Sequence, residues 1–271
     1  MKYKILVLDL DGTLTDSNKK ITLRNKEALL RAQQKGVKVV LASGRPTYGI
    51  AQLADELQLE RYGGYVLSYN GGEIIDWKTK DLLYANVLPN EVIPQLHTCA
   101  QKHDMALLSY DGDYVVTERP TDEYVQKEAF INKMEVRLCE SFLKEVPLPL
   151  PKCLIVGNPD RLVAVEAELS ILLQGVISVY RSEPFFLELV PLGIDKARSL
   201  SVLLNHVELT REEMVAIGDG YNDLSMIEFA GMGVAMGNAQ EPVRKAARYV
   251  TATNDEDGVA LAVERFFLDV E

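Results

Sequence analysis

The chain has 271 residues, of which 47% are hydrophobic and 25% are charged, and its 29 basic and 40 acidic side chains give a formal net charge of −11. This composition is that of an ordinary globular protein and excludes the disordered and fibrous classes. The negative charge argues against nucleic acid and anionic membranes as partners, because either would repel the chain.

The cysteines are few and widely spaced. Cys99, Cys139 and Cys153 include no CxxC pair, which argues against a disulfide scaffold and against a thiolate zinc site. No apolar run approaches the roughly 20 residues that a membrane span requires, and the first apolar stretch turns acidic too early for a secretory signal. We therefore expect a reduced, cytoplasmic protein. The histidines show no metal-ligand spacing and are expected at the surface or in packing: His97, His103 and His206.

The first part of the chain alternates between strand-like and helix-like segments. Compact apolar runs at 4–10, 37–42 and 65–68 predict strands that are buried on both faces of a sheet. Helices are predicted between them, at 22–34 and from Arg45-Pro46 through residue 59, with the proline in the first turn. This βαβαβ order predicts a parallel sheet with right-handed crossovers.

The pattern changes near residue 84. Two strand-like segments at 105–110 and 114–118 flank an Asp-Gly-Asp turn, which predicts an antiparallel hairpin. We expect a mixed sheet with helices on one face through this middle third. Its further predicted elements are helices at 122–131 and 161–173 and strands at 153–156 and 176–180.

Doubly wound character is predicted to return near the end of the chain, with strands at 185–190, 214–217, 234–236 and 249–250. We interpret the chain as a core α/β domain made of residues 1–83 and 190–271, interrupted by an inserted α+β domain at 84–189. The insert carries 16 acids and 9 bases, a net charge of −7 (9 − 16), which leaves −4 for the two core segments together.

The first chemical signal is Asp9-Leu10-Asp11-Gly12-Thr13, directly after the first predicted strand. In open α/β sheets ligands bind at the carboxyl ends of the strands. Two carboxylates two residues apart repel each other unless a cation or a shared proton relieves the crowding. The alternative is an ordinary turn with solvated aspartates, and a motif of this length alone does not decide between them.

Two further signals involve anion binding. Ser43-Gly44-Arg45 ends a buried strand and enters a helix, where a hydroxyl and backbone N–H groups can bind an anion; the alternative is a plain N-cap serine. Lys196 lies in the first turn of a predicted helix behind the N-cap residue Asp195. A lysine there opposes the helix dipole, so a nearby phosphate or carboxylate would explain it, unless it simply faces solvent.

The fourth signal is Gly218-Asp219-Gly220-Tyr221-Asn222-Asp223, between a strand and a helix. Polar side chains flanked by glycines at a strand's carboxyl end suit Mg²⁺, which prefers oxygen ligands. Asn222 or Asp223 could instead cap the helix, but Asp219 precedes the cap and is not explained in that way.

The four motifs in this order resemble those of the haloacid dehalogenase (HAD) superfamily, and more narrowly the Cof-type sugar-phosphate phosphatases with a type IIB cap. The resemblance covers essentially the whole chain, including Asn70-Gly71-Gly72, residues 236–239 and residues 254–260. Two motifs depart from the family pattern: GIDKA stands where GVSKG is usual, and NGG where NGA is usual. Neither change removes a catalytic group.

The resemblance implies a role for each motif residue. Asp9 would be the nucleophile that forms an aspartyl-phosphate, and Asp11 the general acid and base. Mg²⁺ would be the cofactor. Its ligands would be Asp9, the backbone carbonyl of Asp11 and Asp219, with Asp223 beside them. The phosphoryl oxygens would be bound by Ser43, Gly44, Lys196 and Asn222.

The resemblance thus implies a Mg²⁺-dependent phosphatase acting on a small-molecule phosphomonoester, with hexose phosphates the first expectation. The inserted domain would act as a cap that selects the substrate, with Asp111, Arg181 and Glu188 as polar candidates. We expect no nucleic-acid or membrane partner, and a monomer or a weak homodimer. Two alternatives stay open: a phosphomutase of the phosphomannomutase type, and a non-catalytic binding protein for a phosphorylated metabolite.

Overall fold

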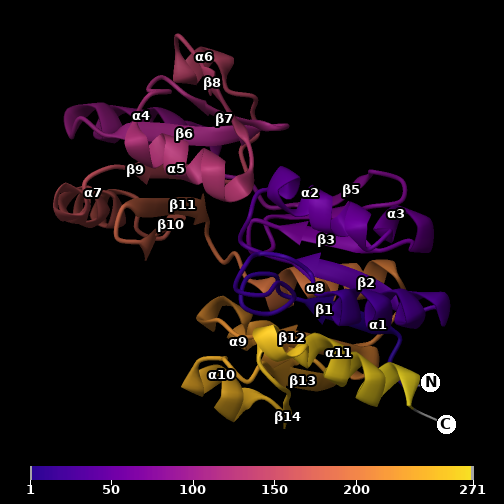
Figure 1. Ribbon diagram of the computed structural model, residues 1–271. Coiled ribbons are helices and arrows are strands. Elements are labelled where there is room, and N and C mark those ends of the chain that lie inside the picture. Colours follow the sequence, from indigo (N-terminus) through magenta and orange to yellow (C-terminus); the bar gives the residue numbers. More distant parts are fainter. Residues whose placement is uncertain (1, 270–271) are drawn as a thin grey trace. The chain divides into compact units, whose positions relative to one another are not determined.

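The computed structural model describes residues 2–269, which divide into two compact units. One unit contains the chain up to Tyr84 together with the chain from Asp195 onward, and the other contains Ala85–Ile194. Each unit has its own β-sheet and its own cluster of buried apolar side chains (Figure 1). No helix in the described part of the chain is both long and apolar enough to cross a membrane.

The first unit is built on an eight-stranded sheet with the order β14-β13-β12-β1-β2-β3-β4-β5. The six strands from β14 to β3 pair in parallel, and β4 pairs antiparallel to β3. Leu8 is in register with Leu41 and Ile217, so three central strands end at one edge. The bounds are β1 (Ile5–Leu8), β2 (Lys38–Ala42), β3 (Tyr65–Ser68), β4 (Glu73–Asp76), β5 (Leu82–Ala85), β12 (Met214–Gly218), β13 (Met232–Ala235) and β14 (Tyr249–Val250).

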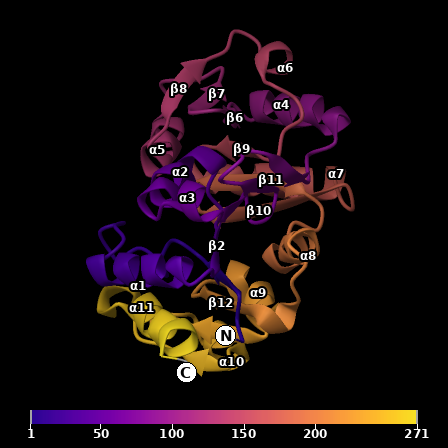
Figure 2. The same cartoon turned by 90° about the vertical axis from the view of Figure 1, so that its right-hand side faces the viewer.

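The strand order runs in opposite directions from β1, through β2 and β3 on one side and β12 to β14 on the other, so right-handed crossovers place helices on both faces of this sheet. α1 (Leu23–Gln34) lies beside α11 (Gly258–Val263), and Figures 1 and 2 both show this pair. The side chain of Thr22 caps α1 by accepting the backbone N–H of Asn25. α9 contacts both α8 and α10. The remaining helices are α2 (Thr47–Glu56), α3 (Leu59–Tyr62), α8 (Lys196–His206), α9 (Leu224–Phe229) and α10 (Glu241–Ala246).

The helix predicted from Arg45 through residue 59 is instead two shorter helices. Pro46 is not in the first turn: its ψ of 157° is extended, and α2 begins at the next residue. Gln58 has a φ of 55°, in the left-handed region, which ends the first helix and starts the four-residue α3. The apolar periodicity continues across this break, so periodicity alone could not reveal it.

The second unit holds a six-stranded sheet with the order β10-β11-β9-β6-β7-β8, in which only β7 and β8 pair in parallel. It is therefore mixed, as the sequence predicts. The bounds are β6 (Ala106–Asp111), β7 (Tyr114–Thr117), β8 (Glu135–Leu138), β9 (Cys153–Val156), β10 (Ile177–Glu183) and β11 (Phe186–Pro191), with helices α4 (Ile93–Lys102), α5 (Glu123–Asn132), α6 (Phe142–Glu145) and α7 (Pro159–Leu172).

Two expectations for this region are wrong. The strand predicted at 185–190 as part of the doubly wound sheet is β11, which pairs antiparallel with β9 and β10 and therefore belongs to the second sheet. Helices also lie on both faces of the second sheet. α4, α6 and α7 share a cluster with Leu107, whereas α5 is hydrogen-bonded through Glu128 to Tyr110, whose side chain points to the opposite face.

Candidate active site

Three of the predicted motifs lie at the carboxyl edge of the first unit's sheet. Asp9 follows β1, Ser43 follows β2, and Asp219 follows β12. These strands are adjacent and parallel, so their ends meet although the residues are far apart in sequence. The fourth motif joins them through Lys196, the first residue of α8.

Lys196 is the centre of the site. Its ammonium group donates to Asp9 Oδ1 at 2.8 Å, to Asp223 Oδ1 at 2.6 Å and to the carbonyl of Ala42 at 2.9 Å. The side chain is fully buried, which excludes the solvent-facing alternative. Two carboxylates and a carbonyl compensate its charge, and this explains why a lysine is tolerated in the first turn of a helix.

Burial and crowding set the electrostatics of Asp9. Burial, followed by repulsion from Asp223, raises the pKa of the Asp9 carboxyl to about 8, although Lys196 acts in the opposite direction. For Lys196, burial lowers the pKa, but the two carboxylates outweigh it and hold the pKa above its ordinary value. The lysine is therefore cationic, and the site still lacks positive charge.

The loop after β12 is fixed by Asp223. Its Oδ2 accepts the backbone N–H groups of Asp219 and Gly220, each at 2.9 Å, while its Oδ1 faces Lys196. Asp219 Oδ1 accepts the hydroxyl of Thr13 at 2.9 Å. Burial raises the pKa of Asp219, and Asp223 adds to the shift. Asp223 thus positions both the lysine and the loop that carries Asp219.

The donor set at this edge fits a hard divalent cation. Carboxylate oxygens of Asp9, Asp219 and Asp223 all lie within 4.8 Å of one another. Oxygen ligands with a net negative charge are what Mg²⁺ prefers. The raised pKa values of Asp9 and Asp219 mark the same deficit of positive charge. The residues present therefore fit the metal that the sequence predicts.

Asp11 is held apart from this carboxylate cluster by two basic side chains. Arg45 Nε donates to its Oδ2 at 2.8 Å and Arg45 Nη2 to its Oδ1 at 2.7 Å, while Lys19 Nζ donates to Oδ1 at 2.7 Å. Burial works to raise the pKa of Asp11, but Arg45 and Lys19 together hold it below its usual value. Sequence reasoning identified Arg45 only as part of the SGR motif and did not foresee this contact.

Polar groups also gather where the β2 and β3 ends meet. Ser43 is buried, and its hydroxyl accepts the backbone N–H of Arg45 at 3.2 Å. Asn222 Nδ2 donates to Asn70 Oδ1 at 3.1 Å. A Cβ added at Gly44 would come within 3.0 Å of Asn70 Nδ2, so glycine permits this close approach. Asn70 was not predicted as a site residue, although the Asn-Gly-Gly motif that contains it was noted.

Comparisons with known proteins agree with this arrangement. The family model described as haloacid dehalogenase-like hydrolase matches residues 6–263. A Bacillus subtilis protein, the 5-amino-6-(5-phospho-D-ribitylamino)uracil phosphatase YcsE, is 32% identical over 272 residues, which cover 98% of this chain and 96% of that protein.

Solved structures extend the likeness to the fold. A haloacid dehalogenase-like hydrolase from Bacteroides thetaiotaomicron shares 64% identity and a TM-score of 0.96, over 98% of this chain and all of that one. The HAD subclass IIB sugar phosphatase BT4131 shares 26% identity and a TM-score of 0.78, over 98% and 99% of the two chains. The predicted fold class, subclass and enzyme class are thereby confirmed, and the chain belongs to the haloacid dehalogenase-like hydrolases.

Proposed function

We propose that this hydrolase is a Mg²⁺-dependent phosphatase of small phosphorylated metabolites, with hexose and related sugar phosphates as its substrates. The observation that carries the proposal is the buried contact of Lys196 with Asp9 and Asp223 at the carboxyl edge of the sheet. This arrangement gives one carboxylate a fixed orientation beside a cation, as a nucleophile toward phosphorus requires.

Asp9 and Asp219 are the residues that would hold Mg²⁺, together with the backbone carbonyl of Asp11. When bound, the ion would supply positive charge that polarises the phosphoryl group and offsets its repulsion by Asp9. Asp223 has both carboxylate oxygens engaged, by Lys196 and by two backbone N–H groups, which favours a positioning role for it.

Asp9 is the proposed nucleophile. Lys196 holds its Oδ1, which leaves Oδ2 to attack phosphorus. The new bond joins Oδ2 to phosphorus, and the bond from phosphorus to the substrate oxygen breaks with its electron pair. The phosphoryl oxygens would be bound by Lys196, Ser43, Asn222 and the backbone N–H of Gly44. Apart from Lys196, these groups are neutral donors, so they do not compete for the charge of Asp9.

Asp11 is the proposed proton carrier. It gives its proton to the departing substrate oxygen and then takes one from the water that hydrolyses the aspartyl-phosphate, so that inorganic phosphate leaves and the enzyme is restored. Arg45 and Lys19 favour the ionised form of Asp11, which is the form needed in the second step. The first step requires the protonated form of Asp11, which Arg45 and Lys19 disfavour.

The substrate class is supported by two relatives and by charge. One relative is named a sugar phosphatase, and the other acts on a phosphorylated ribityl compound. The second unit, the proposed cap, carries the net charge of −7 and disfavours polyanions. Of the polar candidates on it, Asp111 pairs with Arg137, Arg181 with Glu166, and Glu188 with the buried Lys152. The cytoplasmic location and the oligomeric state stay predictions.

The direct test is phosphate release from a panel of sugar phosphates, nucleotides and pyridoxal phosphate, with Mg²⁺ and with EDTA. We expect turnover of sugar monophosphates only with Mg²⁺, none in Asp9→Asn, and accumulation of phosphoenzyme in Asp11→Asn. Undiminished turnover in Asp9→Asn would overturn the mechanism. Transfer of phosphate to a second sugar position would instead reveal a mutase, and tight binding without turnover would reveal a binding protein.

A further inference from the structure

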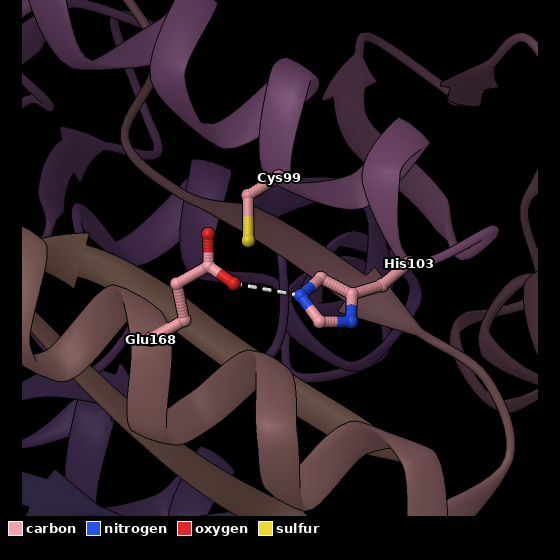
Figure 3. A group of neighbouring side chains, drawn as sticks. All are labelled: Cys99, His103 and Glu168. Carbon is pink, nitrogen blue, oxygen red and sulfur yellow. Dashed lines mark hydrogen bonds and ion pairs between the residues drawn. The ribbon is translucent and has the colours of Figure 1, made fainter.

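A second group of side chains with metal-binding chemistry lies in the other unit, between α4 and α7. Cys99 and His103 are four residues apart on α4 and at its C-terminal cap, and Glu168 lies on α7. One ligand atom of each lies within 4.8 Å of the other two, and His103 Nε2 lies 2.8 Å from Glu168 Oε2. Figure 3 shows the thiol pointing toward the space between the carboxylate and the imidazole ring.

From the sequence, His103 was expected at the surface or in packing, and its spacing from Cys99 was not considered. The pair Cys99 and His103 has i,i+4 spacing, which places both side chains on one face of a helix. The third member is 65 residues from His103 in sequence and is brought close only by the packing of α4 against α7.

A nucleophilic role does not fit this cysteine. Its side chain is only 3% exposed, so a substrate could not reach the sulfur. Burial, and next the negative charge of Glu168, raise the pKa of the Cys99 thiol to about 11, which is the opposite of what an activated nucleophile needs. A metal ion, in contrast, is small enough to reach the sulfur and can displace the thiol proton.

We propose that Cys99, His103 and Glu168 form a tetrahedral site for a zinc-class divalent cation, with water as the fourth ligand. Sulfur, imidazole and carboxylate together are a donor set that Zn²⁺ accepts and Mg²⁺ does not. A thiolate and a carboxylate balance the two positive charges of the ion. Binding forms a metal–sulfur bond and releases the thiol proton to solvent.

Lys102 is the competitor that the ion must displace from Glu168. Its ammonium group lies 2.9 and 2.8 Å from the two carboxylate oxygens of Glu168. The lysine side chain is 61% exposed, and ion pairs of this kind are weak. A bound ion would replace this surface contact by a cross-link between α4 and α7.

The test uses Co²⁺ as a spectroscopic substitute, titrated into the full chain in excess Mg²⁺. Only a cysteine ligand gives a thiolate-to-cobalt charge-transfer band, so Co²⁺ at the Asp9 carboxylates does not contribute. We expect the band in the wild-type protein and its loss in Cys99→Ser. In His103→Gln the affinity for Co²⁺ should fall by about tenfold or more. Matched controls are His97→Gln, which removes the other His–Glu pair of α4, and Cys139→Ser, a buried cysteine of the same unit. Both should keep the band.

Lys102 is exposed, so a substitution at this position should not disturb the packing of the core. Lys102→Ala should bind Zn²⁺ roughly two- to fivefold more tightly by calorimetry, because it removes the competing cation. No charge-transfer band in the wild-type protein, a band that persists in Cys99→Ser, or an unchanged Zn²⁺ affinity in Lys102→Ala would each overturn the proposal.

Discussion

Arg45 holds both carboxylate oxygens of Asp11, with Nε 2.8 Å from Oδ2 and Nη2 2.7 Å from Oδ1. Paired hydrogen bonds of this type combine charge with fixed geometry. They favour the ionised carboxylate, although the first chemical step proposed here requires the protonated acid. The clamp therefore sets the balance between the two roles of one side chain.

Replacing Arg45 should change the pH dependence of the acid-catalysed step. Arg45 helps to hold the pKa of Asp11 below its ordinary value, so loss of the arginine should raise that pKa. In Arg45→Gln the descending limb of kcat/KM for a hexose phosphate should therefore move to higher pH. With p-nitrophenyl phosphate, whose leaving group needs no proton, the limb should not move.

The matched control is Lys19→Gln, since Lys19 also contacts Asp11 but is 59% exposed. Its limb should move less than that of Arg45→Gln. Equal movement with both substrates would show that the limb reports a group other than the acid Asp11.

Removing the buried Lys196 should cost both activity and stability. A raised lysine pKa means that its contribution to stability is complete below its unfolded value of 10.5 and is lost only as the pH rises through the folded value. At pH 7 the Lys196→Met variant leaves Asp9 and Asp223 without their cation, and we expect a loss of about 3–5 kcal/mol in the free energy of unfolding measured with urea.

The turnover of Lys196→Met should also fall, by about a hundredfold or more. Lys245→Met is the control, because its ion pair with Glu241 is exposed and should contribute under about 0.5 kcal/mol. Similar losses of stability in the two variants would contradict the role given to the buried contact.

How much of the site the sequence predicts depends on whether the residues lie at strand ends. Asp9, Ser43 and Asp219 each follow a short apolar run, and parallel strands in register carry such residues to one edge. The clamp of Arg45 on Asp11 could not be predicted, because it depends on side-chain directions within two loops. The same holds for the burial of Lys196, which a helix-start pattern leaves undecided.

The fold shows the same division between local and long-range information. The apolar run at Phe186–Pro191 reads as a strand in any sheet, and only its antiparallel pairing with β9 and β10 assigns it to the second unit. Glu168 contacts His103 across 65 residues, and no local pattern predicts that contact. Whether a segment forms a helix or a strand was predictable from its periodicity, whereas the element against which it packs or pairs was not.

Mg²⁺ should reverse the order of thermal stability of the wild-type protein and the Asp219→Asn variant. Burial, reinforced by Asp223, raises the pKa of Asp219, and a raised carboxyl pKa costs stability as the pH rises through that range. In EDTA at pH 7, Asp219→Asn should therefore unfold at a higher temperature than the wild-type protein. At Mg²⁺ of about 100 times Kd, the wild-type protein should gain about 2.7 kcal/mol and the variant little.

Asp81→Asn, at an exposed carboxylate of the same unit, is the control and should follow the wild-type protein in both conditions. An equal Mg²⁺ response in Asp219→Asn would place the ion elsewhere.

Alanine variants of two glycines with similar positive φ values should distinguish an effect on stability from an effect on catalysis. Gly12 and Gly36 have φ values of +82° and +89°, so alanine at either is strained by about 1 kcal/mol. A Cβ at Gly12 would come 2.5 Å from Asp219 Oδ2, whereas a Cβ at Gly36 would meet nothing within 4 Å. Gly36→Ala should therefore lose stability but keep its activity. Gly12→Ala must displace the Asp219 carboxylate, so its kcat/KM should fall by about tenfold or more and its Mg²⁺ requirement should rise. Measured side by side, equal activities would show that the approach of Gly12 to Asp219 does not matter for the reaction.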